Sequence, residues 1–100
     1  MASNEPNWHP DAIVDADEAK GWYAERSPLA AHGFVLAIDQ AVAVVMEAPE
    51  RWPLRRNDCR RYVLPNRYPF DLIYRLGSNL DIQIVAIAHH KRRPDYWRDR

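Results

Sequence analysis

The period of the hydrophobic pattern changes once along this chain, near Pro53, and this change limits the possible folds more than any other feature. Before Pro53, apolar residues recur every three or four positions, as they do on one face of an α-helix. After Pro53 they alternate, as they do on one face of a β-strand. Helices followed by strands are typical of an α+β domain, in which the helices cover one face of a sheet.

Two helices are predicted in the first half of the chain. Pro10 suits the first turn of a helix, where its missing N–H costs no hydrogen bond, and the pattern that follows should end near Arg26. Ser27 then provides an N-cap and Pro28 a first helical position for the second helix, which should end before Pro49. So short a break between two helices predicts an antiparallel hairpin.

Each predicted helix has an apolar face. On the first helix that face consists of Ala12, Ile13, Ala16, Ala19 and Tyr23. On the second helix it consists of Phe34, Ile38, Ala41, Val42 and Val45. Asp11, Asp15 and Glu18 share another face of the first helix, which we interpret as exposed to solvent. Trp22, Tyr23 and Phe34, at helical spacing, are expected in the core.

Three strands are predicted in the second half, over residues 60–64, 69–76 and 80–88. The last two should form a hairpin around Gly77, and the third is apolar on both faces from Ile84 onward, which favours an interior position. Residues 1–7 make a frayed end or a weak edge strand, and residues 94–100 a short C-terminal turn. The prediction is one domain over residues 1–100, with a helical hairpin on one face of a small, mainly antiparallel sheet of three to four strands, in the order (β)ααβββ.

Composition narrows the class of protein. The one cysteine, Cys59, cannot form an internal disulfide or a cysteine-based zinc site, which fits a reducing cytosol. The longest unbroken apolar run, residues 41–46, is far shorter than the ~20 residues of a membrane span. Residues 1–9 lack the pattern of a secretion signal. We therefore expect a small cytoplasmic domain with no membrane partner and no cofactor.

Charge is divided sharply between the two halves of a chain whose net charge is zero. Residues 1–50 hold 2 basic and 9 acidic residues, for a net charge of −7, whereas residues 51–100 hold 12 basic and 5 acidic residues, for +7. Aromatic residues lie among the basic ones: Trp52, Tyr62, Tyr96 and Trp97. Arginine and aromatic side chains together suit phosphate backbones and unstacked bases, which indicates an anionic partner. The alternative is a solvated face whose long stems cover apolar surface.

The pair His89 and His90 raises the question of metal binding or acid–base chemistry. Neighbouring residues of a strand point to opposite faces, so the pair does not predict a metal site. One histidine near Tyr96 and several arginines could act as a general base beside cations that stabilise a phosphoryl transition state. The alternative is a partly buried histidine at the end of a strand.

Five segments, taken in order and spacing, resemble the RelE/ParE superfamily, the small toxins of bacterial type II toxin–antitoxin and plasmid-stabilisation modules. They are AKGWYAERSP (19–28), APERWP (48–53), RRYVL (60–64), YPFDLIYRL (68–76) and IQIVAIAHHKRRPDYW (82–97). The resemblance extends from Trp8 to Trp97. It implies a compact sheet with a helical hairpin on one side, as the periodicity also predicts.

The superfamily has two mechanisms. RelE-like members cut mRNA on the ribosome without metal, using the ribose 2′-hydroxyl as nucleophile. If this chain is such a nuclease, the resemblance makes Arg61 a phosphate-binding residue and places His90, Arg92 and Tyr96 among the acid–base and stacking groups. ParE-like members inhibit DNA gyrase instead. Asp71 stands where nucleases tend to have a basic residue, and its carboxylate would repel RNA phosphate.

The ParE-like mechanism is therefore our first hypothesis: a gyrase inhibitor held inactive in a hetero-oligomer with its cognate antitoxin. The residues expected to bind the target are Arg60, Arg61, Arg92, Arg93, Tyr96 and Trp97. The antitoxin is expected to cross the helical hairpin and to contact Trp22, Phe34 and Ile38. Two alternatives stay open: a ribosome-dependent endoribonuclease, and a folded, non-toxic module that only binds an antitoxin.

Overall fold

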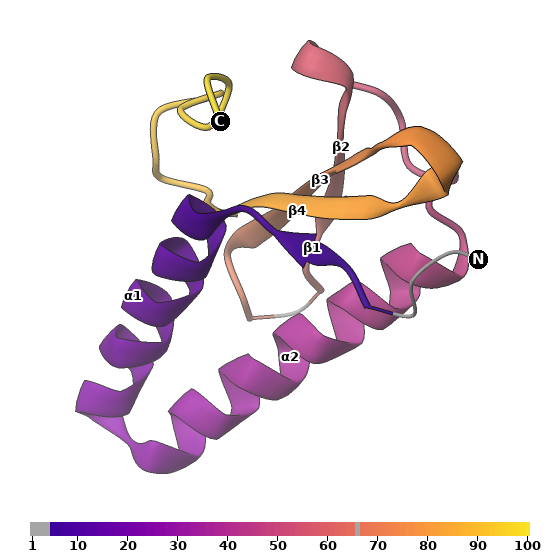
Figure 1. Ribbon diagram of the computed structural model, residues 1–100. Helices are drawn as coiled ribbons and strands as arrows, with labels where there is room; N and C mark the ends of the chain where they lie inside the picture. Colours follow the sequence, from indigo (N-terminus) through magenta and orange to yellow (C-terminus); the bar gives the residue numbers. More distant parts are fainter. Residues whose placement is uncertain (1–4, 66) are drawn as a thin grey trace.

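The helical hairpin lies on one face of a four-stranded sheet in the computed structural model, which describes residues 5–65 and 67–100 (Figure 1). The elements, in chain order, are β1 (Asn7–Trp8), α1 (Pro10–Arg26), α2 (Pro28–Glu47), β2 (Cys59–Val63), β3 (Phe70–Leu76) and β4 (Ile82–His89). This order confirms the predicted (β)ααβββ arrangement. Short 3-10 turns precede β2 and β4.

The two helices begin where the capping residues predict. Pro10 is the first residue of α1, and the side chain of His9 accepts a hydrogen bond from the Asp11 N–H at 3.0 Å. Ser27 separates the helices, and its Oγ accepts from the N–H groups of Leu29 and Ala30 at 3.1 and 3.4 Å. A single residue thus ends one helix and caps the next, which forces the chain to reverse.

The sheet has the strand order β1-β4-β3-β2. β2 pairs with β3 and β3 with β4, both antiparallel, whereas β1 runs parallel to β4 at the edge. The interior position of β4 confirms the prediction from its two apolar faces. The weak edge strand is also present, but it has only two residues, between Pro6 and Pro10. Residues 1–4 of the segment predicted to fray lie outside the described residues.

An irregularity in β4 divides its apolar residues between the two faces. Ile73 pairs with Ala86 and Tyr74 with Ile84, so Val85 is an extra residue in the ladder. As a result Ile84 and Ile87 face the helices, whereas Val85, Ala86 and Ala88 face the opposite side. A strand covered on both faces explains why the sequence of β4 is almost continuously apolar.

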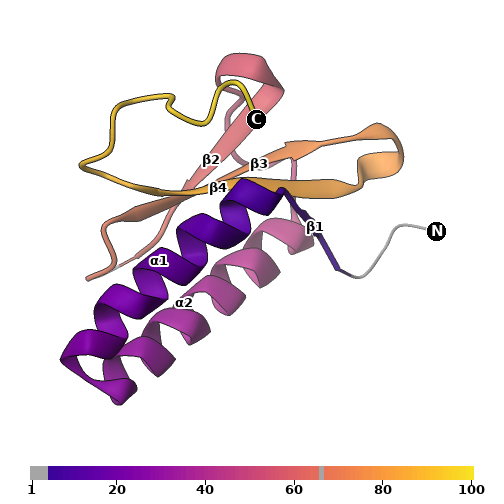
Figure 2. The ribbon, with the colours of Figure 1, turned by 60° about the vertical axis from the view of Figure 1, so that its left-hand side comes forward.

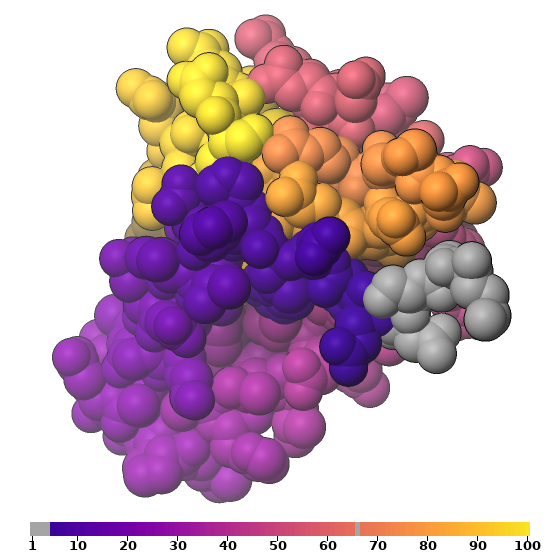
Figure 3. Space-filling view, viewed as in Figure 1, coloured from indigo at the N-terminus to yellow at the C-terminus, as the bar shows by residue number. Residues whose placement is uncertain are grey.

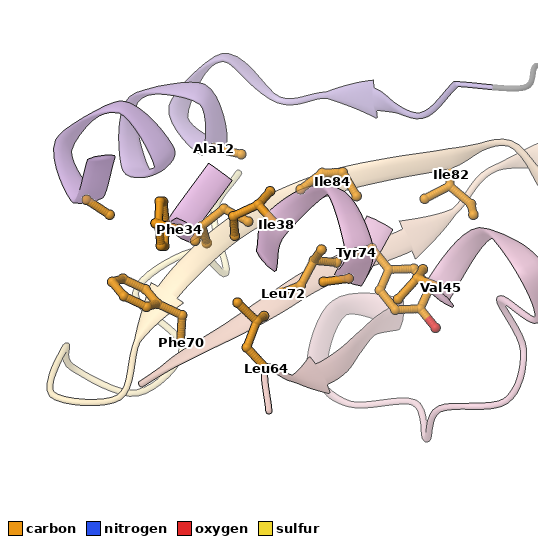
Figure 4. Close-up of a cluster of buried hydrophobic side chains, with 13 residues drawn as sticks. Ala12, Phe34, Ile38, Val45, Leu64, Phe70, Leu72, Tyr74, Ile82 and Ile84 are labelled. Carbon is orange, nitrogen blue, oxygen red and sulfur yellow. The ribbon is translucent and has the colours of Figure 1, made fainter. Parts of the chain in front are cut away.

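Two hydrophobic cores lie on the two faces of the sheet. The larger, the helix-side core, packs α1 and α2 on the strands around Phe34, Leu72 and Tyr74 (Figure 4). The smaller, the outer core, consists of Cys59, Ile73, Val85, Ala86, Ala88 and Trp97. Figure 2 shows the C-terminal segment, residues 90–100, on the side of the sheet opposite the helices. This segment covers the outer core.

The C-terminal segment forms successive turns instead of a helical turn. The N–H groups of Tyr96, Arg98 and Arg100 each donate to the carbonyl three residues earlier, and Asp95 has a positive φ of 60°. Trp97 is only 5% exposed and is part of the outer core. Most of the Trp97 side chain is therefore used in packing, and its role in target binding stays a prediction.

The predicted faces of α1 need correction at three positions. Ile13 and Trp22, expected in the core, are about half exposed, at 47% and 51%. Asp15, expected on a solvated face, is buried. The C-terminal segment buries Asp15, because it returns to the start of α1 and its residues Tyr96 and Arg100 contact the carboxylate. Tyr23 and Phe34 do pack together, with ring centroids 5.1 Å apart.

α2 is more apolar than the longest unbroken run of its sequence indicates. It has 20 residues, and its most apolar stretch has a mean hydropathy of 1.8. By length and composition alone, such a helix could cross a membrane. Phe34, Ile38 and Val45 instead pack against the sheet in the helix-side core. Only 28% of the most apolar stretch is buried, so α2 also presents apolar surface outward.

Candidate functional site

The outer face of the sheet has a hollow of about 380 Å³ between β2, the adjoining ends of β3 and β4, and the C-terminal segment. We call it the basic hollow. Six of the predicted site residues line it: Arg61, His90, Arg92, Arg93, Tyr96 and Trp97. The sheet and the C-terminal segment bring together residues of β2, of the β3–β4 pair and of residues 90–97, which are far apart in the sequence.

Strand pairing explains why Arg61, Asp71 and His90 meet. Arg61 pairs with Ile73 and Asp71 pairs with Val63, so Arg61 and Asp71 are diagonal neighbours across β2 and β3. The N–H of His90 donates to the Pro69 carbonyl at 2.9 Å, which extends the β3–β4 ladder by one step and places the imidazole beside Asp71.

The Asp71 carboxylate contacts both Arg61 and His90. Its Oδ1 lies 2.8 Å from Nε2 of His90, and its Oδ2 lies 3.6 Å from Nη1 of Arg61. The Asp71 side chain is 13% exposed, against 40% for Arg61 and 42% for His90, so the carboxylate lies deepest. Because an ionised carboxylate only accepts hydrogen bonds, Nε2 of His90 is the donor in this contact when Asp71 is ionised. From the sequence, Asp71 is expected only to repel phosphate, and its pairing with Arg61 and His90 has no local signal.

His89 and His90 point to opposite faces, as the strand geometry predicts. The His89 ring stands edge-on to Phe70, with centroids 4.9 Å apart, and its Nδ1 accepts from the Lys91 N–H at 3.0 Å. Burial lowers the pKa of His89, and the nearby His90 and Lys91 lower it further. Within residues 5–65 and 67–100, no three His, Cys, Asp or Glu side chains are grouped to hold a metal ion.

Tyr96 contributes its ring, and not its hydroxyl, to the basic hollow. The Arg92 guanidinium lies 3.9 Å from the ring centroid, a cation–π stack. The hydroxyl donates to Oδ2 of Asp15 on α1 at 3.0 Å. Burial raises the pKa of Tyr96, and the Asp15 charge raises it further. The protonated hydroxyl is therefore occupied inside the protein and unsuited to acid–base work on a bound ligand.

Arg60 does not line the basic hollow. Its Nη1 donates to the carbonyl oxygens of Glu50 and Trp52 at 3.1 and 2.5 Å. These bonds fix the connection between α2 and β2. The expectation that Arg60 contacts the target is therefore not supported by its geometry, because neighbouring strand residues point to opposite faces and Arg61 takes the outer one.

Of the three candidate antitoxin contacts, one is exposed and two are buried. Trp22 is exposed, and the Arg26 guanidinium stacks on its ring at 3.4 Å. Phe34 and Ile38 belong to the helix-side core, so they offer little surface to a partner in this conformation, and their contact with an antitoxin stays a prediction. The exposed apolar residues of α2 are instead Leu29, 77% exposed, and Leu36. Because α2 is apolar on both sides, periodicity alone did not single them out.

Comparisons with known proteins agree on one family. The sequence model described as "ParE toxin of type II toxin-antitoxin system, parDE" matches residues 7–94. Among solved structures, a chain described as "Chromosomal ParDE TA system from P. aeruginosa" superposes with a TM-score of 0.73 at 25% identity. The match covers 89% of this chain and 96% of that chain. A search of curated proteins gives no match.

Proposed function

The chain belongs to the ParE toxin family of type II toxin–antitoxin systems, and we propose that it is a cytoplasmic toxin that inhibits DNA gyrase and is neutralised by a cognate antitoxin protein. The target-binding surface in this proposal is the basic hollow. Arg61, Arg92, Arg93 and the ring of Tyr96 supply the contacts.

The observation that carries the proposal is the position of Asp71 in the basic hollow. Its carboxylate lies deeper than the side chains of Arg61 and His90 and offsets part of the positive charge of Arg61. A phosphate entering the hollow would approach this negative charge, whereas Arg92 and Arg93 remain exposed on the rim. A site with mixed charges is better suited to a protein surface of mixed charges than to a nucleic-acid backbone.

Two assays on the purified protein test the target. In the first, gyrase supercoils relaxed plasmid in the presence of increasing amounts of the protein. In the second, a translation reaction is followed by primer extension to map mRNA breaks. Inhibited supercoiling with intact mRNA is the expected result, and mRNA breaks at ribosomal A-site codons without gyrase inhibition would contradict the proposal.

One contact favours a second candidate, the ribosome-dependent endoribonuclease. An imidazole oriented by a carboxylate, such as His90 by Asp71, is an arrangement that suits a general base. In this alternative Arg61 and Arg92 bind the phosphate and Tyr96 acts only through its ring. His90→Gln would then abolish mRNA cleavage and toxicity and leave antitoxin binding unchanged. If neither assay detects activity and cells tolerate expression, the chain is a folded module that binds an antitoxin only.

We place the antitoxin on the outer surface of the helical hairpin. Trp22, Leu29 and Leu36 present apolar side chains there, and residues 1–50 carry a net charge of −7. An amphipathic segment with apolar residues on one face and basic residues beside them complements both features. The cognate antitoxin is therefore expected to use such a segment.

Paired substitutions on α2 test this surface. Leu29→Ser with Leu36→Ser should weaken antitoxin binding at least about tenfold, as expected for loss of apolar contacts at an interface. Leu80→Ser is the control, because Leu80 is a leucine of the β3–β4 connection that is about as exposed as Leu36. Equal antitoxin affinity of the double variant and the control would place the antitoxin elsewhere.

A further inference from the structure

Asp15 is the one charged residue that is buried within the described part of the chain. Its side chain is 6% exposed, whereas that of Asp11, one turn earlier on α1, is 61% exposed. A carboxylate is removed from water only at a high cost unless hydrogen bonds and an opposite charge replace the water. The partners of Asp15 therefore indicate what the buried charge does.

Four hydrogen bonds reach the Asp15 carboxylate from distant parts of the chain. Arg100 donates through Nη1 to Oδ2 at 2.6 Å and through Nη2 to Oδ1 at 3.2 Å, a two-point pair. The Tyr96 hydroxyl donates to Oδ2 at 3.0 Å, and the Ile87 N–H donates to the same oxygen at 3.2 Å. Arg100 also donates to the Val85 carbonyl at 3.1 Å. One side chain thus joins α1, β4 and the C-terminal segment.

The rest of the C-terminal segment has its own contacts on the β2 side. Asn57 donates to the Arg98 carbonyl at 2.6 Å, and Arg56 lies 3.5 Å from Asp95. Trp97 is buried between the two sides. On the α1 side the attachment is Asp15, and Figure 3 shows the C-terminal residues lying against the start of α1.

The contact chain from Asp15 leads to the rim of the basic hollow. Asp15 fixes the Tyr96 hydroxyl, and the Tyr96 ring supports the Arg92 guanidinium at 3.9 Å. Arg93 is the next residue, and its carbonyl accepts from the Tyr96 N–H. Arg92 and Arg93 are both exposed. Because the Tyr96 ring contacts the Arg92 guanidinium and the Tyr96 N–H bonds to the Arg93 carbonyl, a fixed Tyr96 limits the positions of both residues.

We propose that Asp15 is a positioning residue that clamps the C-terminal segment to α1 through Tyr96 and Arg100, and so holds Arg92 and Arg93 in place to bind the target. Asp15 itself does not line the basic hollow. This role of Asp15 rests on the proposed function in one respect, which is that the target is DNA gyrase. It gives α1 a second role, at its first turns, beside the antitoxin surface farther along the hairpin.

Asp15→Asn is the direct test, because it keeps the size of the side chain and removes its charge. Arg100 then loses its two-point ionic partner and keeps only the longer contact with Asp11, whose Oδ2 lies 3.9 Å from its Nε, so the C-terminal segment should open more often. Asp17→Asn is the matched control, since Asp17 is an exposed aspartate on the same helix. Arg100→Gln breaks the same pair from the other end and serves if Asp15→Asn does not fold.

Limited trypsin digestion with mass spectrometry measures the opening without any target. Cleavage after Lys91 and Arg92 should be at least about tenfold faster in Asp15→Asn and Arg100→Gln than in Asp17→Asn. The increase in the double variant should be smaller than the product of the two single increases, because both substitutions remove the Asp15–Arg100 pair. Cleavage at the control rate in both single variants would overturn the proposal.

Growth inhibition and antitoxin affinity separate positioning from general support of the fold. Asp15→Asn should reduce toxicity in cells at least about tenfold and change antitoxin affinity less than about twofold. A parallel loss of both would show a merely structural role and overturn the proposal. If the wild-type protein is toxic but leaves gyrase unaffected, only the gyrase target is overturned. Trypsin cleavage rates and toxicity still measure whether Asp15 holds the C-terminal segment on α1. A non-toxic wild-type protein overturns both.

Discussion

Replacing Trp97 with alanine tests whether the C-terminal segment is part of the folded domain. An aromatic side chain of this size buries about 150–250 Å², which at about 25 cal/mol/Å² corresponds to roughly 4–6 kcal/mol. Trp97 is 5% exposed, and its neighbours in the outer core are a cysteine, an isoleucine, a valine and two alanines. Side chains this small cannot refill the space. We therefore expect Trp97→Ala to lower the free energy of unfolding by about 4 kcal/mol.

Urea denaturation followed by far-UV circular dichroism measures this loss without relying on tryptophan fluorescence, to which all four tryptophans contribute. Trp22→Ala is the matched control, because Trp22 is 51% exposed. It should cost no more than about 1 kcal/mol. If Trp97→Ala costs as little as the control and abolishes toxicity, Trp97 is a target contact and the packing described here is refuted.

Three further predictions concern other parts of the molecule. Ser27→Ala removes the cap of α2 and should cost about 1 kcal/mol in urea denaturation, whereas Ser78→Ala, in the β3–β4 connection, should cost almost nothing. Asp71→Asn releases Arg61 and His90 and should add about one phosphate contact to the binding of single-stranded RNA. The slope of log affinity against log salt concentration should then steepen by about 0.7, and an unchanged slope would contradict the pairing. The folded-state pKa of His89 lies below its ordinary value of 6.5, so the unfolded state binds this proton more readily and stability should fall as pH drops through about 6.5. His89→Gln should show a shallower fall in unfolding free energy between about pH 7 and pH 5, and a slope identical to that of the wild type would refute the assignment.

Local signals in the sequence predict most of the fold. Pro10, Ser27 and Pro28 set the helix boundaries through capping, which needs only neighbouring residues. The alternation of Phe70, Leu72 and Tyr74 identifies the face of β3 that meets the helices. The two apolar faces of β4 predict its interior position, although the extra residue at Val85 leaves no signal that periodicity detects.

The site is predicted less well, because its geometry depends on contacts over long distances in the sequence. Arg61, His90, Arg92 and Arg93 do meet at one hollow, as the basic excess of the second half indicates. Asp15 is buried by partners 72, 81 and 85 positions away, so its helix gives no hint of them. Trp97 lies among basic residues in the sequence, and only the return of the chain over the sheet makes it a core residue.

In the proposed function, the exposed cations at the rim of the basic hollow bind gyrase. The most direct measurement is inhibition of gyrase supercoiling by the purified double variant Arg92→Glu, Arg93→Glu, compared with Arg51→Glu, Arg98→Glu, which makes the same change in charge at exposed positions outside the hollow. We predict that the first variant loses inhibition while retaining antitoxin binding, and that the second inhibits like the wild type. Equal inhibition by the two variants would contradict the account.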